Sequence, residues 1–139
     1  MNDRLLLLPA LLIPAVWAAP TARSSAYVEA AVANQQQWLT TIREATALLQ
    51  GMQDTASADA AVPALQALAE RMRQLQKDAA GFVPPSAAEE AAFKAATNVA
   101  EIKKTVNAFL NALETVIQAD CYHSPALLEE LPKLMRLEP

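Results

Sequence analysis

One stretch of the chain, residues 86–119, carries the longest uninterrupted helical periodicity in the sequence. Its apolar residues recur at alternating steps of three and four: Ala92, Ala95, Val99, Ile102, Val106, Phe109, Leu113 and Val116. This spacing places them all on one side of an α-helix. Because no Gly or Pro interrupts the stretch, the pattern predicts one continuous helix from Ser86 to Ala119.

A helix start signal stands at the beginning of this stretch. Pro84 and Pro85 are followed by Ser86, and Glu89 comes three residues later. Ser and Glu at this spacing form a capping box, in which two backbone N–H groups at the helix start find acceptors. At about 1.5 Å per residue, such a helix is roughly 50 Å long. An apolar stripe of this length needs partner helices of similar length.

The composition favours an all-α protein. Apolar residues make up 53% of the chain, but aromatic residues only 5%, and there are 2 glycines. Ala and Leu are the most frequent residues, and they suit helices better than strands or tight turns. The net charge is −4, and acidic and basic residues are interleaved. No basic patch is present that could neutralise several phosphates, so we expect no nucleic-acid partner.

Residues 1–18 have the pattern of a secretory signal peptide. Arg4 supplies a short positive region, residues 5–15 an apolar run, and Ala18 a small residue at the cleavage position. The alternatives are a buried N-terminal helix or a retained membrane anchor. The apolar run is short for a bilayer span. We therefore expect cleavage and a periplasmic or secreted protein that does not bind membranes after the signal is removed.

Cleavage after Ala18 gives a mature chain that starts at Ala19. Cleavage one residue later would place Pro20 directly after the cut, which is disfavoured. We expect residues 19–24 to form a short flexible lead before the folded domain.

Two amphipathic segments lie between this lead and residue 86. The first spans residues 25–52 and has a stripe of Val28, Ala31, Gln35, Trp38, Ile42, Ala45, Leu49 and Met52. The second has a stripe of Leu65, Leu68, Met72, Leu75, Ala79 and Phe82. Ser57 is its expected N-cap and Gly81 its expected left-handed C-cap. Pro63 either kinks this helix or occupies its first position.

A final segment begins with Ser124 as N-cap and Pro125 at the first helical position. It is amphipathic, and Pro132 splits or kinks it. All connections are short, which makes consecutive helices antiparallel neighbours. We therefore expect residues 25–139 to form a single domain. Its expected fold is an up-down-up antiparallel three-helix bundle, with the short C-terminal segment folded over one end.

The run from Asp54 to Met72 carries a resemblance to known proteins. Its sequence, DTASADAAVPALQALAERM, resembles a segment of uncharacterised small exported helical proteins of bacteria, and the likeness covers about 19 residues. The resemblance implies an exported helical bundle. It implies no activity, ligand or catalytic residue.

Cys121 is the only cysteine in the chain. In an oxidising compartment, a single thiol forms an intermolecular disulfide or stays reduced. Cys121 follows a helix C-terminus and is adjacent to Asp120, and both features raise a thiol pKa. We therefore expect a small buried residue at the end of the bundle, with an intermolecular disulfide as the alternative, and no catalytic nucleophile.

His123 is the only histidine, and a metal site needs several converging ligands. In an up-down-up bundle, the ends of the first and third helices lie at the same pole. That would bring Met52 and Asp54 near Cys121 and His123. Met, Cys and His suit copper, and a Met–His pair can ligate haem. We expect no resident metal or cofactor, and keep Met52, Cys121 and His123 as metal candidates.

The chain also resembles the small haem-binding four-helix bundles in size and export. Those families place the axial Met near the start of the first helix and the His near the end of a full fourth helix. This chain has neither residue in those positions. It also lacks the Cys-x-x-Cys-His motif of covalent haem attachment.

Other candidate sites are binding surfaces. Leu127, Leu131 and Leu134 would form an interaction face if the last segment does not pack on the bundle. Tyr27, Trp38 and Phe109 mark either a binding groove or, as is common at helical spacing, the core. The adjacent glutamates, Glu89–Glu90 and Glu129–Glu130, suit solvated helix faces.

These patterns favour a non-enzymatic exported protein of the cell envelope that acts through protein–protein contacts. Its expected partner is an unidentified envelope protein or a second copy of the chain. The alternative is a small periplasmic carrier of a metal or haem that uses Met52, Cys121 and His123.

Overall fold

The computed structural model describes residues 22–136, with side chains from residue 26 onward. The expected signal peptide at 1–18 and the expected start at Ala19 lie outside the described residues. The first helix, α2 (Ala22–Gln50), begins three residues before the expected start at residue 25. The lead expected over residues 19–24 is therefore helical from Ala22 onward.

The described residues form helices and no strands, which confirms the all-α prediction. After α2, the chain forms α3 (Thr55–Ala80), α4 (Ala87–Ala96), α5 (Val99–Gln118), a short turn η1 (Asp120–His123) and α6 (Pro125–Met135). None of the helices in this part of the chain is long and apolar enough to span a membrane.

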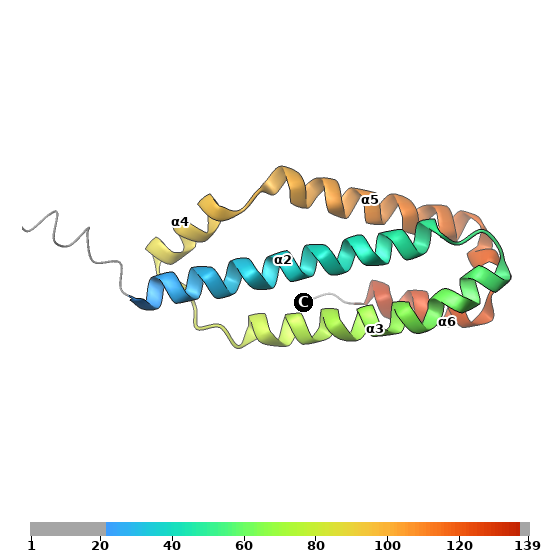
Figure 1. The fold of residues 1–139 in the computed structure, drawn as a ribbon, viewed down its shortest axis with the longest axis horizontal. Coiled ribbons are helices and arrows are strands. Elements are labelled where there is room, and N and C mark those ends of the chain that lie inside the picture. The colour runs from blue at the N-terminus through green and yellow to red at the C-terminus, as the bar shows by residue number, and fades with distance from the viewer. Residues whose placement is uncertain (1–21, 137–139) are drawn as a thin grey trace, which may run out of the picture.

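α2 is the central helix of the fold. It packs against α3 on one side and against α4 and α5 on the other, whereas α6 packs against α3 (Figure 1). Within the described part of the chain, α5 packs closely against neither α3 nor α6, so the helices follow the order α5–α2–α3–α6 around the core. The segment with the longest apolar periodicity, residues 86–119, is therefore not the central element of the fold.

The prediction of one uninterrupted helix over residues 86–119 is wrong. Thr97 and Asn98 adopt extended backbone conformations, and the chain changes direction between α4 and α5 (Figure 1). The Asn98 side chain accepts a 3.1 Å hydrogen bond from the backbone N–H of Glu101 and caps α5. The Thr97 hydroxyl donates to the carbonyl of Phe93 at 2.8 Å. Short polar side chains of this kind compete with the helical backbone and favour helix ends.

The break also changes which residues of this region are buried. Leu113 and Val116 are buried as expected, but Ala92, Ala95 and Val99 are exposed. Thr105 and Ala112 are buried in α5 although they lie outside the expected stripe. The stripe prediction fails because α4 and α5 are separate helices that pack on α2 independently.

The caps of the other helices are partly as expected. Ser86 and Glu89 form the predicted capping box, with N–O distances of 3.1 and 3.2 Å. The N-cap of α3, however, is Asp54, and Ser57 is its capping-box partner. Pro63 lies inside α3 and does not start it. Gly81 caps α3 in a right-handed conformation (φ −78°), so the predicted left-handed cap is wrong.

The core consists of two hydrophobic clusters. The larger cluster lies near the C-terminal end of α2 and combines side chains of α2, α3, α5, η1 and α6: Leu49, Met52, Ala58, Val62, Leu65, Ala69, Ala112, Leu113, Val116, Cys121, Leu127, Leu131 and Leu134. The smaller one contains Ile42, Met72 and Leu75. Phe109 packs against both clusters. The predicted stripes of the first two helices supply much of this core.

Candidate functional site

The turn η1, between α5 and α6, has an unusual backbone. Asp120, Cys121, Tyr122 and His123 all have positive φ angles, between 50° and 58°. They form a short left-handed turn, a conformation that costs roughly 1–2 kcal/mol per non-glycine residue. A consecutive run of such residues persists only where the surrounding structure fixes it.

Contacts with α3 hold this turn in place. The hydroxyl of Thr55 donates a 2.6 Å hydrogen bond to the backbone carbonyl of Tyr122. Directly after the turn, the hydroxyl of Ser124 donates to a carboxylate oxygen of Asp59. Ser124 also caps α6 as predicted, accepting from the N–H of Leu127 at 3.2 Å.

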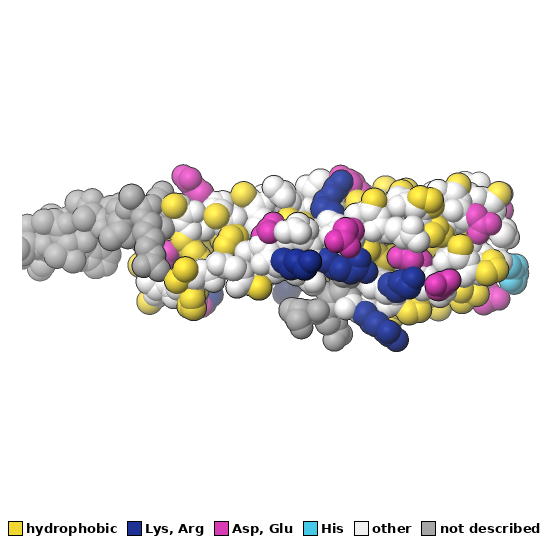
Figure 2. Space-filling model, turned by 90° about the horizontal axis from the view of Figure 1, so that it is seen from below, with side chains coloured by type: hydrophobic (Ala, Val, Ile, Leu, Met, Phe, Trp, Pro, Cys, Tyr) yellow, Lys and Arg dark blue, Asp and Glu magenta, His cyan; other side chains and the backbone are white. Residues whose placement is uncertain are grey.

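The structure places the predicted Met52, Cys121 and His123 at one pole but does not make their side chains converge. Met52 and Cys121 belong to the larger core cluster. The His123 side chain is 81% exposed and lies 3.2 Å from Asp120 at the end of the molecule, where Figure 2 shows it in cyan. Among the described residues, no three His, Cys, Asp or Glu side chains are grouped to hold a metal ion.

Cys121 is a buried free thiol in this structure. Burial, together with the charge of the adjacent Asp120, raises the pKa of the thiol above its ordinary value. An intermolecular disulfide at Cys121 would therefore require the turn to open first.

The predicted interaction face on the last helix is not exposed. Leu127, Leu131 and Leu134 are buried in the larger cluster because α6 packs against α3. The condition for that interaction face, an unpacked last segment, is therefore not met.

Other apolar residues are exposed instead. Val99, Leu110 and Ile117 of α5, and Leu128 and Met135 of α6, each expose half or more of their surface. We call these five residues the apolar strip. Sequence reasoning did not predict that they are exposed, because periodicity shows where the apolar residues of a helix lie but not how much of that face the neighbouring helices cover.

Each part of the apolar strip occupies one face of its own helix. On α5, positions 99, 110 and 117 fall on one face, opposite the side that Lys104 and Ala108 turn toward α2. On α6, Glu130 faces Gln66 of α3, and Leu128 and Met135 lie on the other side.

The predicted aromatic groove is partly present. Tyr27 and Trp38 of α2 line an open pocket of about 450 Å³ together with Phe82 and Phe93. The rings of Tyr27 and Phe82 meet edge to face, with centroids 6.0 Å apart. Phe109 does not line this pocket and packs into the core.

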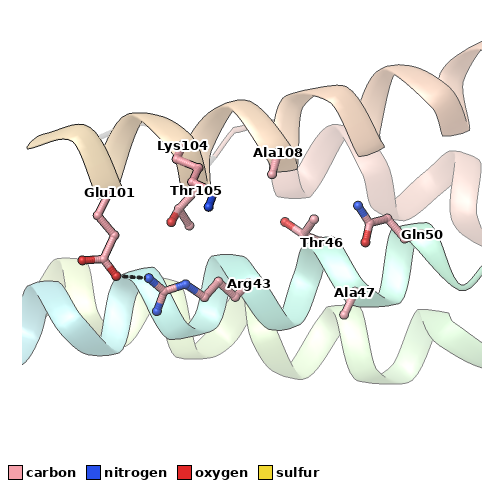
Figure 3. Close-up of a pocket in the computed structure, with 8 residues that line it drawn as sticks. All are labelled: Arg43, Thr46, Ala47, Gln50, Glu101, Lys104, Thr105 and Ala108. Atoms are coloured by element: carbon pink, nitrogen blue, oxygen red, sulfur yellow. Dashed lines mark hydrogen bonds and ion pairs between the residues drawn. The ribbon is translucent and has the colours of Figure 1, made fainter.

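A second pocket, which we call the polar cleft, lies between α2 and α5 (Figure 3). It has a volume of about 330 Å³ and is lined by Arg43, Thr46, Ala47, Gln50, Glu101, Lys104, Thr105 and Ala108. The guanidinium of Arg43 is paired with the Glu101 carboxylate across its mouth. No local sequence pattern indicates this pocket, because its polar residues lie beside the apolar stripes and come together only through the relative rotation of the two helices.

Comparisons with protein-family models, curated protein sequences and solved structures find no match to the chain.

Proposed function

We propose that this protein is exported to the cell envelope and acts there, without enzymatic activity, through protein–protein contacts. Its partner is a second copy of the chain or another envelope protein. Export rests on the signal-peptide pattern of residues 1–18. In this arrangement α2, α3 and α4–α5 are the three long segments of an up-down-up bundle, and α6 covers one end.

The apolar strip is the observation that carries this proposal. Single exposed hydrophobic residues are normal on protein surfaces. Here, however, Leu110 and Ile117 repeat at helical spacing on α5, and Leu128 and Met135 do the same on α6. Rows of exposed apolar residues on the helices of a small protein mark a contact surface.

Sedimentation of charged variants tests the contact. Ile117→Glu and Leu110→Glu place a charge within the strip, and Asn107→Glu places the same charge at an exposed polar position of the same helix. If the partner is a second copy, wild type and Asn107→Glu form dimers at concentrations where the two strip variants are monomers.

A heterologous partner gives a different result. In that case all four proteins are monomeric, and crosslinking in the intact envelope yields a product with wild type and Asn107→Glu but not with the strip variants. Equal behaviour of all four proteins in both experiments would overturn the proposal.

Export is tested by fractionating cells that express the complete chain and measuring the mass of the product. The proposal expects a mature form that begins at Ala19 in the periplasm or medium. An unprocessed chain in the cytosol would contradict it.

A further inference from the structure

The α2–α5 interface is open at the polar cleft. Six of the eight residues that line the cleft have polar or charged side chains. Thr46 and Thr105, from opposite helices, are only 8% and 7% exposed. In Figure 3 both hydroxyls lie in the space between the helices. Thr46 donates to the backbone carbonyl of Ile42 at 2.8 Å. The Thr105 hydroxyl forms no hydrogen bond with any described residue, and its oxygen is not closed off from solvent, so it can donate to a molecule in the cleft.

The charges around the cleft favour an anion. Arg43 and Lys104 bring two positive groups and Glu101 one negative group. Arg43 forms an ion pair with Glu101, whereas Lys104 forms none within the described part of the chain. The nearby Glu44 pairs with Arg71 of α3 at 2.8 Å, away from the cleft. The cleft therefore has one uncompensated positive charge, next to an unpartnered hydroxyl.

We infer that the polar cleft binds the carboxylate group of a small organic monoanion. Lys104 supplies the charge, and the hydroxyl of Thr105 and the side-chain amide of Gln50 supply hydrogen-bond donors. Ala108 lines the cleft and offers an apolar surface to a short carbon chain. A carboxylate fits better than a phosphate, because Glu101 at the mouth repels a dianion. The carboxylate belongs either to a free small acid or to the C-terminus of a peptide.

The test is an NMR titration of the purified ¹⁵N-labelled chain with two carboxylates. Butyrate represents free acids, and N-acetylalanylalanine represents peptide C-termini; butyramide and N-acetylalanylalaninamide are the neutral controls. We expect saturable shifts, confined to residues 43–50 and 101–108, with at least one carboxylate and with neither amide. The carboxylate that binds more tightly identifies the source.

Three variants separate a specific site from general attraction. Lys104→Gln should weaken binding about tenfold or more, and Thr105→Val, which keeps the side-chain shape, about threefold to tenfold. Lys103→Gln removes the same charge from the neighbouring exposed lysine, which does not line the cleft, and should leave affinity unchanged. Circular dichroism melts confirm that each variant is folded.

Three results would overturn the inference. They are the absence of saturable shifts with either carboxylate, equal shifts with the amides, and equal losses in Lys103→Gln and Lys104→Gln. Because the cleft is separate from the apolar strip, these results leave the proposed protein contact untouched.

Discussion

The hydroxyl of Thr55, at the first turn of α3, donates a 2.6 Å hydrogen bond to the backbone carbonyl of Tyr122, 67 residues later in the chain. The acceptor lies in the middle of the left-handed turn η1. This bond therefore connects the start of one helix to the strained connection between two others.

Thr55→Val keeps the shape of the side chain and removes this hydrogen bond. We expect it to lower the free energy of unfolding by about 1 kcal/mol, because the Tyr122 carbonyl loses its side-chain partner. Urea denaturation measures the change. Thr115→Val is the matched control, since the Thr115 hydroxyl bonds only to the carbonyl of Asn111 within its own helix. Its effect should stay within about 0.5 kcal/mol.

His123→Gly should stabilise the protein. His123 has φ 58° and an exposed side chain, so glycine relieves the left-handed conformation and removes only an exposed ion pair. The expected gain is about 1 kcal/mol in thermal or urea unfolding. Gln118→Gly, in the right-handed last turn of α5, should instead cost about 1 kcal/mol or less. The same sign for both substitutions would show that η1 is not left-handed in solution.

Substitutions of Asn98 distinguish two helices from one. As an N-cap, Asn98→Ala should cost about 1 kcal/mol and Asn98→Gly only a few tenths. In an uninterrupted helix the order reverses, because glycine is about 1 kcal/mol worse than alanine in a helix interior. Urea denaturation of the two variants decides between these orders.

The packing of α6 is tested by two leucines of that helix. Leu131 is 4% exposed and Leu128 is 51% exposed. Leu131→Ala should cost about 2–5 kcal/mol, because it opens a cavity in the larger cluster. Leu128→Ala should change stability by no more than about 0.5 kcal/mol. Similar values for the two would mean that α6 does not pack on α3 as described.

The buried Cys121 thiol makes stability depend on pH in the alkaline range. Its folded-state pKa is raised, so its contribution is complete below the unfolded-state pKa of about 8.5 and is lost as pH rises through the folded value. Wild type should therefore lose more stability than Cys121→Ala between about pH 8 and pH 10. Unfolding curves at both pH values measure this difference.

The same burial should slow alkylation of Cys121 by iodoacetamide. The matched control is the urea-unfolded chain, in which the thiol is accessible. Equal rates for the folded and unfolded chains would show that the thiol is already exposed in the folded state.

Much of the helical framework is predictable from the sequence, because its signals are local. A capping box depends on two residues three positions apart, and this spacing predicts the helix cap at Ser86. The Ile42 and Leu65 stripes depend only on helical periodicity. The break at Asn98 was also visible in principle, since Asn98 is followed by Glu101, but the absence of Gly and Pro favoured a continuous helix.

The remaining features depend on contacts that no local pattern contains. Left-handed backbone at Tyr122 runs against the preference of that residue, and it is imposed by partners such as Thr55 in a different helix. The polar cleft arises only when Thr46 and Thr105 are brought together by the packing of α2 on α5. Helical periodicity predicts which face of each helix is apolar, but it does not predict how two packed helices are rotated relative to each other.

The hydrophobic core stabilises the two ends of the molecule unequally. α4 contributes no hydrophobic residue to either cluster, and its one buried residue is Glu89. It packs on α2 alone, while the pole around Cys121 is tied together by four helices. We therefore expect amide hydrogens of α4 to exchange with solvent through small local openings, and those around the larger cluster to exchange only when the whole domain unfolds. On this basis α4 should open and close again while the helices around Cys121 stay folded.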